Sequence, residues 1–236
     1  MQRMRDIRKL CLGIVAAAFV WPAAGAEVRP GDGDDIAVRV QPCAACHGEH
    51  GRAAEEAYAP SIAGKPSGYL FEQLRNFRDG RRPQLVMQPM LAFLTDDYLR
   101  EIAAYYAGEK PAARVTQRGT SDQVLAAGRA LVERGDGARE LPACQSCHGA
   151  ELLGAEPGIP GLVALSPDYL AAQLGAWRGG VRNAKAPDCM AHVAKLLTPN
   201  EIAAVTAWIA SRPAPEAHAR ATRPPTELPL RCGAAP

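Results

Sequence analysis

The pentapeptide Cys-x-x-Cys-His occurs twice in the chain, about a hundred residues apart, and each copy belongs to a longer repeated segment. "CAACHG" at 43–48 matches "CQSCHG" at 144–149, and "YLFEQLRNFRDGRR" at 69–82 matches "YLAAQLGAWRGGVR" at 169–182. Further on, "MQPMLAFLT" at 87–95 matches "MAHVAKLLT" at 190–198. A duplicated unit of about this length predicts two like domains rather than a solenoid.

Both copies have the same predicted helices, and neither shows a strong strand alternation, so the expected fold class is all-α. Helices are expected to end the copies at 96–107 and 199–210, where apolar residues recur at i, i+3 and i+7. Middle helices are expected at 67–79 and 167–179, and further helices precede the cysteine pairs at 34–40 and 121–135. Thr198 and Glu201, with Pro199 between them, predict a capping box, and Thr95 is the expected N-cap in the first copy.

The order of segments predicts an exported protein with two domains. Residues 1–26 combine a basic start, an apolar run of eleven residues and "AGA", which is typical of a cleaved signal peptide. A membrane anchor is the alternative, but spanning a bilayer takes ~20 apolar residues. Two like domains are expected at 27–108 and 121–212, joined by a linker at 109–120 and followed by a Pro-rich tail at 213–236. The mature protein is expected to be soluble and periplasmic.

The charge balance argues against nucleic-acid binding. The full chain carries 27 basic and 25 acidic side chains, and the signal segment carries four and one of them, which leaves 23 and 24. The mature chain therefore has a net charge of −1, whereas a nucleic-acid-binding protein needs a strongly basic face.

The repeated pentapeptide is the attachment signature of c-type haem. Two thiols separated by two residues reach the two vinyl groups of one haem, and the adjacent histidine falls beneath the iron. The expected cofactors are therefore two covalent haem c groups, bound by Cys43, Cys46, Cys144 and Cys147, with His47 and His148 as axial ligands. Disulfides, a zinc site and a thioredoxin-like redox pair are the alternatives. A zinc site would unite the two pairs, and a redox pair needs a βαβ context that the sequence lacks.

A methionine occupies the same place in each copy and is the expected sixth ligand. Met87 and Met190 both lie seven residues before a Leu-Thr helix start, although each could instead be a core methionine. Met90 has no repeated partner and is expected to be a packing residue. Three further histidines are expected to be solvated or to lie behind the ligands: His50, His192 and His218.

Cys189, next to Met190, allows two interpretations. A disulfide to Cys232 would pin the tail to the second domain, as is common in an oxidising compartment. Alternatively, a Cys189 thiolate would bind the second iron and lower its potential. We prefer the disulfide.

Taken together, these motifs resemble the dihaem cytochrome c4 type, two class I cytochrome c domains in tandem, over about residues 34–211. The resemblance implies that each domain is wrapped around a covalently bound haem with His/Met ligation. It also implies that the carbonyls of Pro60 and Pro160 accept the histidine ring N–H, and that haem propionates contact Tyr69, Tyr169, Arg82 and Arg182. The sequence departs from the family at "PGLVAL", at Cys189 and in the tail.

The expected function is electron transfer without catalysis. The partners would be redox proteins, namely a membrane oxidase, a cytochrome bc complex or a dehydrogenase. One alternative is a haem subunit of a dehydrogenase acting on a sulfur compound or an alcohol. Another is a thiolate-ligated haem enzyme acting on sulfur compounds, which Cys189 motivates.

Overall fold

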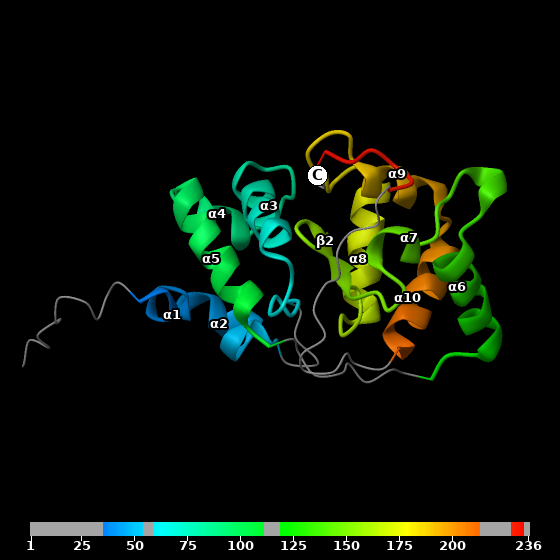
Figure 1. Cartoon of the computed structure of the whole chain (residues 1–236), viewed down its shortest axis with the longest axis horizontal. Helices are drawn as coiled ribbons and strands as arrows, with labels where there is room; N and C mark the ends of the chain where they lie inside the picture. Colours follow the sequence, from blue (N-terminus) through cyan, green and yellow to red (C-terminus); the bar gives the residue numbers. More distant parts are fainter. Residues whose placement is uncertain (1–34, 54–58, 111–118, 213–227, 234–236) are drawn as a thin grey trace, which may run out of the picture.

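The structure is a computed structural model that describes residues 35–53, 59–110, 119–212 and 228–233. Figure 1 shows two helical lobes side by side: the first lobe, residues 35–110, and the second lobe, residues 119–212. The expected all-α class is confirmed. The signal segment, most of the linker and His218 lie outside the described residues. Within the described ranges, no helix is long and apolar enough to cross a membrane.

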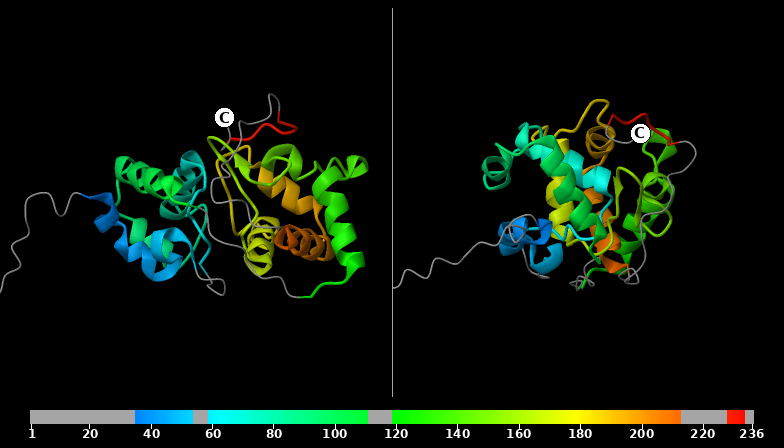
Figure 2. Two further views of the ribbon diagram at one scale, coloured as in Figure 1. Left: turned by 60° about the horizontal axis from the view of Figure 1, so that its bottom comes forward. Right: turned by 60° about the vertical axis from the view of Figure 1, so that its left-hand side comes forward.

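The first lobe contains five α-helices within its described residues. Its middle and final helices, α3 and α5, pack against each other (Figure 2). As predicted, α5 buries Leu99, Ile102 and Tyr106 along one face, each at most 6% exposed. The helices are α1 (Ile36–Arg39), α2 (Gln41–His47), α3 (Ser67–Arg78), α4 (Met87–Leu91) and α5 (Asp96–Gly108), with a 3-10 turn at Glu49–Gly51.

The second lobe repeats this order with a much longer first helix. Gly128 of α6 lies against the backbone of α10 at Ala204, where any Cβ would clash with a carbonyl oxygen. This glycine lets the two helices cross closely, and the apolar core forms around the crossing. The helices are α6 (Asp122–Arg134), α7 (Gln145–His148), α8 (Pro167–Arg178), α9 (Cys189–Leu196) and α10 (Pro199–Ser211), with a 3-10 turn at Gly137–Arg139.

Helix starts follow the predicted capping chemistry. The Thr198 hydroxyl accepts from the Glu201 N–H while the Glu201 carboxylate accepts from the Thr198 N–H, so the capping box is confirmed. Thr95 caps α5 by accepting from the Tyr98 N–H. In each lobe these caps fix where the final helix begins, and therefore how it meets the middle helix.

A short hairpin in the second lobe was not predicted. Strands β1 (Gly154–Ala155) and β2 (Ile159–Pro160) pair antiparallel. Two-residue strands are too short to leave an alternating pattern, which explains why the sequence does not reveal them. The hairpin matters for the site because β2 ends at Pro160.

Candidate functional site

Each cysteine pair lies on one helical turn that ends in the histidine. Cys43 and Cys46 belong to α2, and Cys147 belongs to α7, which Cys144 precedes as N-cap. Among the described residues, none of these four sulfurs forms a disulfide. Burial raises the pKa of Cys43 and Cys147, and raises that of Cys144 to about 11. A reactive redox pair needs a lowered thiol pKa, so the raised pKa of these three thiols argues against the thioredoxin-like alternative.

The two histidines have the same hydrogen bond in both lobes, as the resemblance implied. His47 Nδ1 lies 2.9 Å from the Pro60 carbonyl oxygen, and His148 Nδ1 lies 2.8 Å from that of Pro160. Burial lowers the pKa of both rings, which favours the neutral form. A neutral ring that donates through Nδ1 keeps Nε2 as the basic nitrogen, the form that binds a metal.

A glycine directly after each histidine turns the chain away from the ring. Gly48 has φ +74° and Gly149 has φ +83°, values that residues with a side chain rarely adopt. At Gly48 an added Cβ would also come within 2.9 Å of the Ala53 amide nitrogen. The Cys-His-Gly sequence therefore both presents the histidine and ends its helix.

The methionines lie at the beginning of matching helices. Met87 is the first residue of α4 and packs at the edge of the first apolar core, and Met190 is the second residue of α9. Their role as iron ligands stays a prediction. Met90, expected to pack, is 45% exposed, so that expectation is wrong; it lies on the outer face of α4. His50 and His192 are exposed, as expected.

The residues expected to contact propionates instead contact one another across the two lobes. Arg82 donates to the Tyr169 hydroxyl at 2.8 Å and to Gln173 at 2.7 Å. In return, Arg182 donates to Gln73 at 2.7 Å and hydrogen-bonds Tyr69. Such an exchange of equivalent contacts is the mark of a two-fold relation. The duplicated domains therefore face each other pseudo-symmetrically.

These two arginines provide a test of whether haem fits. Arg82 is 8% exposed and Arg182 is 4% exposed, and among the described residues no carboxylate forms an ion pair with either guanidinium. Burial, followed by the charge of Arg82, lowers the pKa of Arg182 to about 10. Buried like charges are costly without an anion. Two propionates per haem would supply that anion, so thiols, imidazoles and arginines together fit the group.

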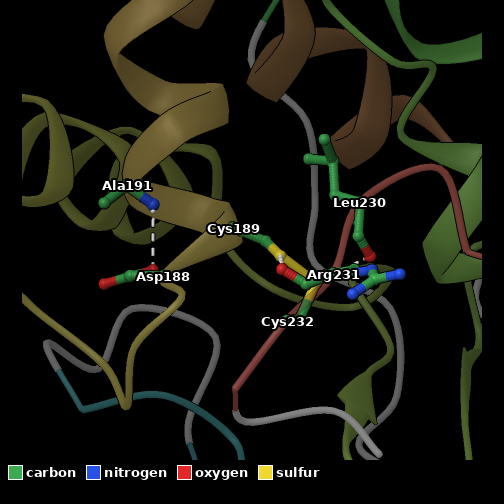
Figure 3. The surroundings of a disulfide bond; sticks show 6 residues. All are labelled: Asp188, Cys189, Ala191, Leu230, Arg231 and Cys232. Atoms are coloured by element: carbon green, nitrogen blue, oxygen red, sulfur yellow. Dashed lines mark hydrogen bonds between the residues drawn. A yellow bond between two sulfur atoms is a disulfide. The ribbon is translucent and has the colours of Figure 1, made fainter.

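The disulfide between Cys189 and Cys232 is confirmed, with the two Cα atoms 5.4 Å apart. Figure 3 shows the bond beside Asp188, whose carboxylate accepts from the Ala191 N–H and caps α9. Residues 228–233 of the tail are thereby held next to Met190. Because a disulfide sulfur is no thiolate, the thiolate-ligated alternative for the second haem loses its ligand.

Three residues that form contacts between the lobes were not expected from the sequence: Lys65, Gln73 and Gln173. The glutamines recur in "Y-L-x-x-Q-L", and this recurrence was the available signal. Lys65 aligns with Leu165, so the available signal was a charged residue in the first copy at a position where the second copy has an apolar one.

No family model matches the chain. A thiosulfate dehydrogenase electron acceptor from Stutzerimonas stutzeri is 33% identical over 204 residues, covering 81% of this chain and 94% of that protein. A cytochrome c4 from Pseudomonas aeruginosa is 35% identical, covering 71% of this chain and 82% of its own length.

Two solved structures have the same fold. Reduced cytochrome c4 from Pseudomonas stutzeri matches with a TM-score of 0.65 and 30% identity, covering 74% of this chain and 95% of that chain. A thiosulfate dehydrogenase from Marichromatium purpuratum also matches with a TM-score of 0.65, at 40% identity over 72% of this chain. This chain spans only 36% of that larger chain. With these likenesses and the paired histidine sites, the chain is an electron-carrying c-type cytochrome that belongs to the dihaem cytochrome c4 family.

Proposed function

We propose that the chain is a periplasmic dihaem carrier that accepts electrons from a thiosulfate dehydrogenase. The observation that carries the proposal is the likeness to proteins named as acceptors of that enzyme over nearly their whole length, 94% and 95% of two such relatives. The likeness to part of a solved thiosulfate dehydrogenase points the same way. The signal peptide at 1–26, removed on export, would place the carrier in the periplasm.

Each domain, 27–108 and 121–212, would hold one haem c. Cys43 and Cys46 would form the thioether bonds in the first domain, and Cys144 and Cys147 those in the second. When bound, the haem supplies a one-electron iron couple. The chain supplies His47 and His148, held as neutral rings by their proline carbonyls, and the two buried arginines for the propionates.

Met87 and Met190 would complete the ligation. A thioether on the sixth position raises the potential and closes the iron to substrates, which suits a carrier rather than an enzyme. The oxidised holoprotein should then show the near-infrared methionine–iron band at the intensity of two haems. Met87→Ala and Met190→Ala should each remove half of it. An unchanged band in either variant would rule out that methionine as a ligand.

The partner is tested by mixing. Purified thiosulfate dehydrogenase, thiosulfate and the oxidised holoprotein should together give a reduced haem spectrum, whereas omission of the enzyme or of thiosulfate should leave the protein oxidised. Reduction by an alcohol dehydrogenase or a quinoprotein dehydrogenase, but not by the thiosulfate dehydrogenase, would refute the proposed electron donor.

A permanent subunit of the dehydrogenase is the second candidate, favoured by the solved chain that is almost three times as long as the matched region. Size-exclusion chromatography of the mixture distinguishes the two. A free carrier elutes by itself and is reduced at a rate that depends on its concentration, whereas a subunit elutes with the enzyme.

A further inference from the structure

Lys65 forms a contact between the lobes that has no symmetric counterpart. From the segment ahead of α3, its Nζ donates to the Gly161 carbonyl oxygen at 2.8 Å. In the second lobe the equivalent residue is Leu165, which is buried in its own apolar core at 8% exposure. The arginine contacts are exchanged in both directions, but this one runs only from the first lobe to the second.

The acceptor of this hydrogen bond is next to the group that holds the second histidine. Gly161 directly follows Pro160, the last residue of β2, whose carbonyl accepts from His148 Nδ1 at 2.8 Å. The ammonium of Lys65 is therefore bound one peptide away from the carbonyl that orients the ring. In the first lobe the equivalent residue, Ser61, uses its hydroxyl on Gly51 within the same lobe.

The electrostatics agree with this geometry. The charge of Lys65 acts through space on the His148 ring. Burial also lowers the pKa of Lys65 to about 8, which leaves the side chain mostly charged at neutral pH. Among the described residues no carboxylate forms an ion pair with Lys65. Within these ranges, its charge is therefore not neutralised by an ion pair.

We propose that Lys65 is a positioning residue contributed by the first domain, which fixes the Pro160–Gly161 segment and raises the reduction potential of the second haem. A fixed cation near the iron disfavours the oxidised, more positive state. The cation also weakens the ability of the Pro160 carbonyl to polarise the His148 ring N–H. A less polarised ring donates less electron density to the iron, which again raises the potential. The proposal rests on His148 ligation as stated under the proposed function.

The test is a spectroelectrochemical titration of the holoprotein with Lys65→Met, which keeps the apolar stem and removes the charge. The equilibrium constant for electron transfer between the two haems should shift about tenfold in favour of the first haem, because the potential of the second haem falls. A tenfold shift corresponds to 59 mV for a one-electron couple. The same comparison is repeated in a protein that also carries Met87→His. Only the second haem then retains the near-infrared methionine band, so this band reports the potential of the second haem alone.

Three matched variants separate charge from structure. Lys65→Arg should retain the potential, and Lys65→Gln, which keeps a donor without charge, should behave like Lys65→Met. Lys195→Met removes an equal charge from an exposed position on α9 and should have no effect. Recovery of the potential by Lys65→Gln would overturn the electrostatic account.

An unmoved second haem in a folded Lys65→Met protein, or an equal shift of both haems, would overturn the proposal entirely. Thermal melts of each variant establish folding, and Lys65→Arg carries the test if the methionine variant unfolds, because a lowered second potential with the charge retained would contradict the proposal. The titration involves no dehydrogenase, so failure of the proposed electron donor would leave this result unaffected.

Discussion

The two lobes have the same histidine geometry but differ in how much apolar core the protein itself provides. In the first lobe a four-residue helix precedes the cysteines, whereas in the second the 13-residue α6 crosses α10 at Gly128. The second lobe also carries the disulfide. Near Met87, by contrast, Leu85 and Phe93 are 95% and 96% exposed. We conclude that the shared features serve the haem, and that the first lobe relies on the haem more for its stability.

Removing one haem at a time should have the largest effect. Cys43→Ala with Cys46→Ala, and separately Cys144→Ala with Cys147→Ala, should each leave one haem per chain by mass and by haem quantification. The first pair should lose more helix by circular dichroism, because α1 and α2 span only four and seven residues, whereas α6 in the second lobe spans 13. Equal helix loss in the two variants would contradict the difference that we infer between the lobes.

Removal of the disulfide should affect only the second lobe. Cys189→Ser with Cys232→Ser opens a link across 43 residues and should lower the free energy of unfolding of that lobe by about 2–4 kcal/mol. Replacing both cysteines avoids a stray thiol beside Met190. Thermal unfolding followed at the haem bands should show one transition moved and the other unchanged; a shift of the first lobe's transition would mean that the tail also stabilises that lobe.

Gly128→Ala tests the helix crossing. Its Cβ would clash with the Ala204 carbonyl and push α6 from α10, at a cost of about 2–3 kcal/mol in the second lobe. Gly175→Ala on α8 is the matched control, since nothing lies within 4 Å of its Cβ, and helix propensity predicts a gain of up to about 1 kcal/mol. Denaturant melts of both proteins measure the two changes. Equal effects would show that propensity, not packing, decides.

Glu201→Gln should have the smallest effect. Hydrogen bonding from Arg139, and then from the Thr198 N–H, lowers the pKa of Glu201 to about 2. Because the folded pKa is depressed, the carboxylate stabilises the second lobe above about pH 4.5, and this stabilisation is lost as the pH falls towards 2. The pair is partly exposed, so the loss at pH 7 should be at most about 1 kcal/mol.

The first lobe offers the control for this prediction. In the first lobe, Tyr98 occupies the helix position that Glu201 occupies in the second lobe. Asp97→Asn, at the neighbouring position, removes a carboxylate that is 91% exposed. Its unfolding free energy should change by less than about 0.5 kcal/mol. A pH-independent loss in Glu201→Gln would show that packing rather than charge makes the box stabilising.

Local features of this fold were readable from the sequence because local chemistry determines them. Periodicity located α5 and α10, and Thr198 with Glu201 located a helix start. The family resemblance supplied the His–Pro contacts, which lie only 12 and 13 residues apart in sequence. The exchange between Arg82 and Tyr169 spans 87 residues and the Lys65 contact spans 96. Such contacts depend on how two folded units dock, and no periodicity within one segment encodes docking.

The fate of the sulfur atoms has a consequence for how this protein is made. Cys189 and Cys232 must be joined by oxidation, while the proposed attachment residues, Cys43, Cys46, Cys144 and Cys147, would have to stay reduced until haem arrives. A random oxidant would pair any of the six, and a tight bond within Cys43–Cys46 would block attachment. Assembly would therefore need disulfide-forming enzymes for one pair of cysteines and thiol-reducing enzymes for the other four. An excess of either activity would leave chains without the disulfide or without haem.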